Sequence, residues 1–311
     1  MLSVVVSEWL PNSELDRLRT RLHVHYDPEL FASSSSLVAA LETAHGVIVR
    51  NRTKIDRHVV ETASELTVVG RLGAGLDNVD VEACADAGVE VIFAPGINAV
   101  SVAEYVMGAM VALMRPVFSS TAAMVRGEWP RWGHTFGHEL DGKTMGIIGY
   151  GSIGRHVAVR AAAFGMQVIA HDPYVPAADE AWSSVRNVTL DTVLTEADVI
   201  SVHAALTSET HGLIDSNRLL LVKPQAVLIN TSRGGTVDEM AVANALHEGR
   251  LAGAALDVFA SEPLGPEAAA IFSGLDNLIL TPHVSGNTEE AVTRVCRTIV
   301  DGVMAALMQD T

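Results

Sequence analysis

The sequence predicts an α/β protein made of two domains, each with a parallel β-sheet covered by helices. Three observations predict this fold class. The chain has 311 residues, enough for two domains of ordinary size. Short runs rich in Val and Ile alternate with longer helix-compatible segments along nearly its whole length. Most of these runs are apolar throughout, which is typical of parallel strands buried on both faces of a sheet.

The predicted strands form two series. The first comprises residues 2–7, 46–50, 66–70 and 89–93, and the second comprises residues 145–150, 166–172, 197–203, 226–230 and 278–280. Between them lies APGINAVSVAEY, residues 94–105, which we interpret as the junction of the two domains. Pro95 and Gly96 end the last strand of the first series, and Ser101 is a candidate cap for a long helix that starts near Val102.

Composition excludes several classes of function. The net charge is −16, from 21 Lys and Arg against 37 Asp and Glu, which disfavours nucleic acids and anionic lipid surfaces as partners. The longest apolar run near a helix, residues 105–114, is about half of what spans a bilayer. The N-terminus lacks the features of a signal peptide, and Cys84 and Cys296 are too few for a disulfide framework. We expect a cytoplasmic protein, without a metal site because no HExxH or CxxC pattern occurs.

The segment GIIGYGSIGR, residues 146–155, predicts a dinucleotide-binding turn between a strand and a helix over 153–164. Gly149 permits the tight turn, Gly151 lets the backbone approach a pyrophosphate, and Gly154 lets the helix lie close to the sheet. The start of the helix at Ser152 and Ile153 offers free N–H groups to the phosphates.

An acidic residue ends the next predicted strand. Asp172 follows Gly151 by 21 residues, where its carboxylate can accept hydrogen bonds from the hydroxyls of the adenosine ribose. The same carboxylate would repel a 2′-phosphate, and the following stretch, PYVPAADEAW, contains no Arg or Lys to bind one. The sequence therefore predicts NAD as the cofactor in preference to NADP.

Three residues that could carry chemistry follow later apolar strands: Arg233, Glu262 and His283. We expect them at the carboxyl edge of the sheet, where open α/β sheets bind ligands. Each alone has a structural explanation, but all three in this order suit hydride transfer to a nicotinamide. His283 could exchange the hydroxyl proton, and a carboxylate beside it would favour its protonated form. Arg233 could hold a substrate carboxylate and polarise the adjacent carbonyl.

Four motifs now carry a resemblance to a known family: RLGAGLDNVD (71–80), NAVSVAE (98–104), LDGKTMGIIGYGSIGR (140–155) and TPHVSGNT (281–288). With them the chain resembles the D-isomer-specific 2-hydroxyacid dehydrogenases, most closely the short phosphoglycerate and hydroxypyruvate dehydrogenases. The resemblance implies that Arg233, Glu262 and His283 are the catalytic set, with His283 as the acid/base.

The resemblance also implies further binding residues. The backbone N–H groups of Gly73, Ala74 and Gly75 would bind the substrate carboxylate together with Arg233. The implied NAD contacts, with Asp257 near the carboxamide, are Gly149, Gly151, Ser152, Ile153, Gly154, Asp172, His203, Ala204, Thr231, Asp257 and Gly286. The chain departs from the family pattern where Ala204 and Ala205 replace a usual proline after His203, and where Tyr150 replaces an aliphatic residue in the glycine turn.

The domain arrangement follows from the same resemblance. Residues 1–98 with 286–311 would form the substrate-binding domain, and residues 99–285 an inserted Rossmann-type NAD domain. The active site would lie in the cleft between the domains, which closes on binding. The family also implies a homodimer, in which the segment RGEWPRWGH (126–134) reaches the partner.

Two other functions remain open at the level of sequence. Formate dehydrogenase belongs to the same superfamily, but formate has no hydroxyl proton to remove, so a Glu–His pair argues against it. An NADH-binding regulator like the C-terminal-binding corepressors would bind the cofactor without turnover.

The substrate itself depends on a basic segment, VRNRTKID, which by resemblance borders the pocket. We hypothesise that Arg50, with Arg52 beside it, binds a second anionic group such as a phosphate or sulfonate. The alternative is that Arg50, Arg52 and Lys54 form a solvated surface patch.

Overall fold

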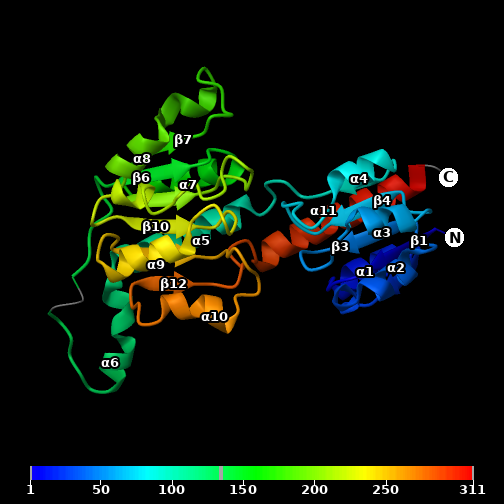
Figure 1. Cartoon of the computed structure of the whole chain (residues 1–311), viewed down its shortest axis with the longest axis horizontal. Helices are drawn as coiled ribbons and strands as arrows, with labels where there is room; N and C mark the ends of the chain where they lie inside the picture. Colours follow the sequence, from blue (N-terminus) through cyan, green and yellow to red (C-terminus); the bar gives the residue numbers. More distant parts are fainter. Residues whose placement is uncertain (1, 133–135, 310–311) are drawn as a thin grey trace. The chain divides into compact units, whose positions relative to one another are not determined.

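The computed structural model describes residues 2–132 and 136–309. The chain divides into two compact units, one of residues 1–98 with 287–311 and one of residues 99–286. Each unit has one parallel sheet with helices on both faces, so the predicted α/β class with two parallel sheets is confirmed (Figure 1). The boundary falls at Asn98, inside the stretch 94–105, and Gly286 belongs to the larger unit.

The sheet of the smaller unit has the order β2-β1-β3-β4-β5. Its strands are β1 (Ser3–Val6), β2 (His23–Tyr26), β3 (Gly46–Val49), β4 (Val68–Arg71) and β5 (Glu90–Ile92). Side chains of successive residues face opposite sides of a strand. Val47 and Val69 therefore pack in one core with α2 (Ser34–Leu41), α3 (Arg57–Thr62) and α4 (Val81–Asp86), and Ile48 and Val68 pack in another with α1 (Asn12–Arg19) and α11 (Glu289–Gln309).

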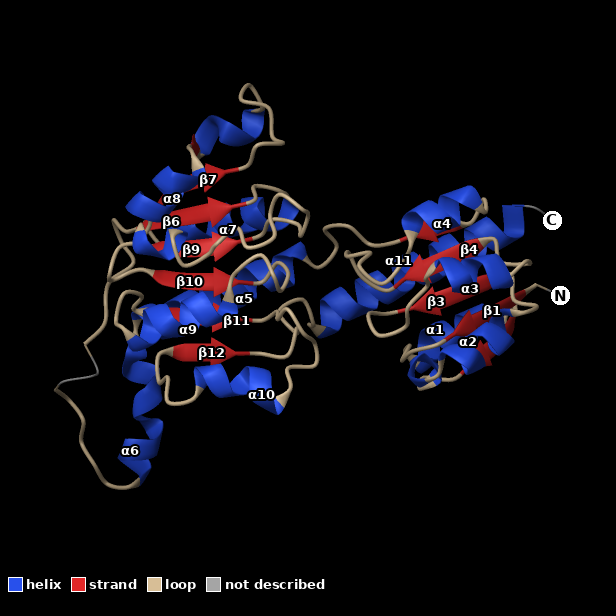
Figure 2. Cartoon of the chain, viewed as in Figure 1, coloured by secondary structure: helices blue, strands red, loops and turns tan. Residues whose placement is uncertain are grey.

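The sheet of the larger unit has the order β12-β11-β10-β9-β6-β7-β8, and the strands from β12 to β7 lie side by side in that order in Figure 2. They are β6 (Thr144–Ile148), β7 (Gln167–His171), β8 (Arg186–Asn187), β9 (Val199–Val202), β10 (Val227–Asn230), β11 (Gly253–Leu256) and β12 (Leu278–Leu280). The helices α5 (Ala99–Met114) and α7 (Ser152–Ala163) pack in the core on one face. The helices α8 (Leu190–Glu196) and α9 (Glu239–His247) pack in a core that contains Ile148, Ile200 and Leu228 on the other face. Burial on both sides explains why β9 and β10 are apolar at nearly every position.

Two details differ from the sequence prediction. The strands β2, β8 and β11 are absent from the predicted series: β2 reads HVHY with alternate exposed residues, β8 has only two exposed polar residues, and β11 reads GAAL without a β-branched residue. The first two are edge strands, so neither needs apolar side chains on two faces, whereas β11 is buried between β10 and β12. The predicted cap at Ser101 is wrong, because α5 begins at Ala99 and Ser101 lies inside its first turn. This turn is packed against the rest of the protein, and both Ala99 and Ser101 are buried.

After α5 the chain leaves the sheet. Pro116 ends the helix, since a proline disfavours helical geometry in the residue before it, and the short helices η2 (Pro116–Ser120) and α6 (Thr121–Val125) follow. In the described part of the chain no single helix is long and apolar enough to cross a bilayer. Taken together, α5 and residues 116–125 have the length and apolar composition of a membrane-spanning helix, but a bend of 70° separates them.

Candidate active site

The predicted catalytic and cofactor residues all follow strands of the larger unit. Because every pairing in this sheet is parallel, the carboxyl ends of its strands meet at one edge. That edge is where open α/β sheets bind their ligands. The site can therefore be described turn by turn along it.

The turn after β6 needs its three glycines for different reasons. Gly149 has φ +92°, and a Cβ there would lie 2.7 Å from the backbone nitrogen of Ala204. A Cβ on Gly154 would lie 2.4 Å from the carbonyl oxygen of Gly149. A Cβ on Gly151 would meet no protein atom within 4 Å. The protein itself therefore requires the first and third glycines, whereas the space beside Gly151 is open to a ligand at the first turn of α7.

Asp172 and Tyr150 join this turn to the end of β7. The two carboxylate oxygens of Asp172 accept hydrogen bonds from the backbone N–H groups of Tyr150, at 2.7 Å, and Tyr174, at 2.9 Å. The ring of Tyr150 is buried, stacks on Trp182 with 4.8 Å between centroids, and its hydroxyl donates to the carbonyl of Ala181 at 3.3 Å. An aliphatic residue could make neither contact. Tyr150 thus anchors the glycine turn to the short helix η3 (Glu180–Ser184), a role that the sequence did not suggest.

His203 follows β9 and lies between two hydroxyl groups. Its Nε2 is 2.8 Å from Oγ of Ser201, and its Nδ1 is 3.3 Å from Oγ1 of Thr231. Burial lowers the pKa of His203 to about 3, so the ring is neutral at physiological pH. Both ring nitrogens face these hydroxyls, so the ring of His203 is not directed at a cofactor. The predicted cofactor contacts of His203 and Ala204 would therefore involve their backbone atoms, which lie against Gly149.

His283 and Glu262 form a hydrogen-bonded pair at the ends of β12 and β11. Nδ1 of His283 lies 2.8 Å from Oε2 of Glu262, and the backbone N–H of Phe259 donates to Oε1 at 3.0 Å. Partial burial raises the pKa of the Glu262 carboxyl, but the hydrogen bonds from His283 and Phe259 act in the opposite direction. Together with the positive charges of His283 and Arg233 they hold its pKa below the usual range. Glu262 is therefore a carboxylate at neutral pH.

Arg233 follows β10 and completes the group. Its Nη1 donates to the carbonyl oxygen of Ser232 at 2.7 Å, and its charge acts on the carboxyl of Glu262. Its neighbour Gly234 is in close contact with the turn after β11, since a Cβ at this position would lie 1.9 Å from the carbonyl carbon of Phe259. The sheet thus brings together a guanidinium, a carboxylate and an imidazole from three adjacent strands.

Asp257 is fully buried at the end of β11. Its carboxylate accepts hydrogen bonds from the backbone N–H groups of Val284 and Ser285, each at 2.9 Å. The carboxylate therefore holds the loop that carries His283. Gly286 follows this loop and is partly exposed.

The predicted substrate residues Arg50, Gly73, Ala74 and Gly75 lie in the smaller unit, after β3 and β4. Glu8, buried at the end of β1, accepts hydrogen bonds from the backbone N–H groups of Arg50 at 2.8 Å and Thr53 at 2.9 Å. The guanidinium of Arg50 lies over the exposed ring of Trp9, 5.3 Å from its centroid. Glu8 was not predicted as a site residue, although a carboxylate directly after an apolar strand was a usable signal.

A second arginine was also missed. Arg71 ends β4, in register with Val49 of β3, so it lies beside the strand that leads to Arg50. A Cβ on Gly73 would lie 1.7 Å from Nη1 of Arg71. The guanidinium of Arg71 therefore lies against Gly73, and a side chain at position 73 would displace it.

Residues of the kind that bind metal ions do not gather anywhere in the ranges 2–132 and 136–309. No group of three or more His, Cys, Asp or Glu side chains there could hold a metal ion.

Comparison with known proteins gives a consistent result. Residues 107–285 match the family model "D-isomer specific 2-hydroxyacid dehydrogenase, NAD binding domain". The chain is 44% identical over 308 residues, 99% of each protein, to the (S)-sulfolactate dehydrogenase of Chromohalobacter salexigens. It is 42% identical over 260 residues to the D-3-phosphoglycerate dehydrogenase of Methanocaldococcus jannaschii, with 83% of the chain aligned to about half (49%) of that longer protein.

A solved structure is similar over nearly the whole chain. The D-lactate dehydrogenase of Aquifex aeolicus, solved with NAD and lactic acid, superposes with a TM-score of 0.88 at 26% identity. The alignment covers 99% of this chain and 96% of that one.

Proposed function

The chain belongs to the D-isomer specific 2-hydroxyacid dehydrogenase family and is an NAD-dependent oxidoreductase acting on the CH–OH group of a 2-hydroxy acid, and from this premise we propose that its substrate carries a second anionic group on the third carbon. We favour a sulfonate, with a phosphate as the alternative. The observation that carries the chemistry is the pairing of His283 with Glu262 beside Arg233. Formate would have no use for this pair, since its oxidation releases no hydroxyl proton.

The residues of the larger unit suit NAD. The open space at Gly151 and the free N–H groups at the start of α7 can receive the pyrophosphate. The carboxylate of Asp172 retains lone pairs for the ribose hydroxyls and would repel a 2′-phosphate. The Oδ2 atom of Asp257 accepts one backbone N–H group, but its side chain is fully buried, so a contact with the carboxamide of the nicotinamide requires the loop over it to move.

In the proposed mechanism NAD would supply the hydride chemistry when bound, and the residues of the protein move the proton. Nε2 of His283 takes the hydroxyl proton in the oxidation and donates it to the carbonyl oxygen in the reduction. The carboxylate of Glu262 on Nδ1 fixes the ring and stabilises its protonated form. Arg233 binds the carboxylate of the substrate and polarises the carbonyl.

The proposed second anion site lies in the smaller unit. Glu8 fixes the backbone at Arg50, and the register of β3 with β4 brings Arg71 next to the same sheet edge. The guanidinium of Arg71 lies against Gly73, and Arg50 follows the adjacent strand, so this edge of the sheet carries two arginines. Sulfolactate and 3-phosphoglycerate, the compounds in the names of the two relatives, both carry a second anion on C3.

The stereochemical names agree with this reading. In lactate the carboxyl group outranks the methyl group, so the D-arrangement is labelled R. In sulfolactate the sulfur on C3 makes that carbon outrank the carboxyl group, so the same arrangement in space is labelled S. An (S)-sulfolactate dehydrogenase therefore handles the D-arrangement, in keeping with the family.

We expect Arg50→Ala to raise KM for 3-sulfopyruvate about tenfold to 100-fold and to leave KM for pyruvate within twofold, since one charge-assisted contact is lost. Lys54→Ala is the matched control, because Lys54 is an exposed cation of the same segment. Steady-state NADH oxidation with both substrates measures the effect. Equal changes for the two substrates, or equal changes in the two variants, would make this segment a solvated surface patch.

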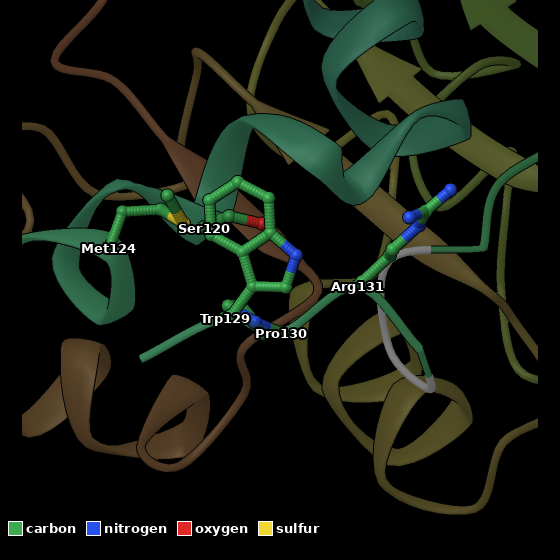
Figure 3. A pocket seen from close by; sticks show the side chains of 5 residues that line it. All are labelled: Ser120, Met124, Trp129, Pro130 and Arg131. Carbon is green, nitrogen blue, oxygen red and sulfur yellow. The ribbon is translucent and has the colours of Figure 1, made fainter. Parts of the chain in front are cut away.

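We further propose that the chain forms a homodimer through the segment of residues 116–132. This segment exposes large apolar side chains, including Phe118, Val125, Trp129 and Trp132, of which Val125 is 82% exposed. Ser120, Met124, Trp129, Pro130 and Arg131 line a pocket of about 250 Å³ (Figure 3). Apolar surface of this kind is typical of a protein interface. Gly133 and His134, the last residues of the segment predicted to reach a partner, lie outside the described residues.

Sedimentation velocity tests the dimer. Val125→Asp should shift the protein to monomer, because a charge would be buried in the interface. Leu220→Asp changes another exposed apolar residue, outside this segment, and should leave the dimer intact. A wild-type protein that sediments as a monomer would contradict the proposal.

We place the enzyme in the cytoplasm. Its cofactor is available there, and both cysteines, Cys84 and Cys296, are free and buried. A reporter fused to the C-terminus and found in the periplasmic or extracellular fraction would contradict this location.

A further inference from the structure

The loop that carries His283 is held by a single buried carboxylate. The backbone N–H of His283 donates to the carbonyl oxygen of Asp257 at 2.8 Å. The carboxylate of Asp257 accepts the N–H groups of the next two residues, as described above, and Oδ1 also accepts the hydroxyl of Thr281 at 2.6 Å. Asp257 therefore has hydrogen bonds to four of the five positions from 281 to 285, and the fifth is Pro282, which has no N–H group to donate.

The hydrogen-bond chain continues to helix α5. The hydroxyl oxygen of Tyr105 lies 2.7 Å from Oγ1 of Thr281. An ionised carboxylate can only accept hydrogen bonds, so the hydroxyl of Thr281 donates its one hydrogen to Asp257. Oγ1 of Thr281 must then accept, and Tyr105 is the donor. The donors and acceptors of both hydrogen bonds are thereby fixed: Tyr105 donates to Thr281, and Thr281 donates to Asp257.

His283 has a backbone conformation that its surroundings must enforce. Its φ is +55°, and among the described residues it is the only one other than glycine with a positive φ. L-residues rarely adopt this conformation, and where it occurs it often marks a functional position. The bonds to Asp257 hold the backbone of His283, and the bond to Glu262 holds its ring.

Tyr105 has the properties of a permanent donor. It lies on α5 and is partly buried against the core of the larger unit. Burial raises the pKa of Tyr105; the hydrogen bond with Thr281 acts in the opposite direction, and the charge of Asp257 raises the pKa further. The hydroxyl therefore keeps its proton over the whole range in which the enzyme can be assayed.

We propose that Tyr105 is a positioning residue of the reaction, which sets the geometry of His283 through Thr281 and Asp257. The inference rests on the proposed role of His283 as the acid/base. The proposal gives Tyr105 no direct contact with the substrate or the cofactor. Its effect should appear in the step in which His283 exchanges a proton, and not in binding.

The test is Tyr105→Phe, which removes one oxygen atom and keeps the packing of the ring. We expect kcat to fall about threefold to tenfold, since one hydrogen bond in the network is lost. The Kd for NADH and the KM for the 2-oxo acid should stay within twofold. Thr281→Val should lower kcat by at least as much, and the double variant should be no worse than Thr281→Val alone, because both changes break one chain.

Tyr26→Phe is the matched control, because it removes the hydroxyl of a tyrosine in the smaller unit and should leave kcat unchanged. Additive effects of Tyr105→Phe and Thr281→Val would overturn the proposal, as would an unchanged kcat in Tyr105→Phe. If instead His283→Ala retained activity, the role of His283 would be wrong. If His283→Ala were inactive and Tyr105→Phe fully active, only the inference about Tyr105 would fail.

Discussion

Replacing His283 by alanine should lower kcat for the reduction of a 2-oxo acid by about 10³-fold, because positioned acid/base catalysis contributes about 10²- to 10⁴-fold. The imidazole lies on the loop after β12, whereas the proposed pyrophosphate site lies at the first turn of α7. The Kd for NADH should therefore stay within twofold of the wild-type value. Steady-state rates and a fluorescence titration with NADH measure the two quantities.

The control for this variant is His247→Ala. His247 is exposed in the last turn of α9 and makes no predicted contact with the site. It should have wild-type kcat. A His283→Ala variant that retained more than about a tenth of kcat would remove His283 from the proposed role.

Replacing Glu262 by glutamine should lower kcat by about 10²-fold, since the ring of His283 loses the charge that favours its protonated form. Glutamine has nearly the same shape, and its amide oxygen can still accept the N–H of Phe259. The change therefore tests the charge separately from the packing. A kcat within twofold of wild type would mean that the pair has no catalytic role.

The same variant gives a pH-dependent effect on stability. The pKa of the Glu262 carboxyl is lowered in the folded protein, so its ionised form stabilises the fold above the unfolded pKa, about 4.3. This contribution is lost as the pH falls through the lower, folded pKa. The Tm of the wild type should exceed that of Glu262→Gln at neutral pH, and the difference should shrink towards pH 3. A Tm difference that is independent of pH would contradict the assignment.

Much of the fold was predictable because burial on both faces of a sheet leaves a simple pattern. The runs VVV in β1, VISV in β9 and VLIN in β10 could be recognised without any structure. Edge strands leave no such pattern, and β2, with His23 and His25 exposed, was missed for that reason. The start of α5 was misplaced because Ser101 has a capping side chain but is buried by tertiary packing.

The site was predictable to the extent that each residue follows a strand. Arg233, Glu262 and His283 could be proposed from their order along the chain, and the structure places His283 and Glu262 in direct contact. The hydrogen bond between Tyr105 and Thr281 joins residues that are 176 positions apart, and Tyr105 lies in a helix that reads as plain core. Glu8 and Arg71 also act on distant loops. Contacts of this kind depend on the topology of the sheet and leave no local signal.

The most direct test of the proposed function is the initial rate of NADH oxidation by the wild-type protein with pyruvate, glyoxylate, hydroxypyruvate, 3-phosphohydroxypyruvate and 3-sulfopyruvate, repeated with NADPH. We expect kcat/KM to be highest for the substrates with a second anion, with 3-sulfopyruvate first, and to fall when NADPH replaces NADH. A preference for hydroxypyruvate or glyoxylate would contradict the second anion site. No turnover with any of the five, in a protein that still binds NADH, would contradict the enzyme itself and indicate an NADH-binding regulator.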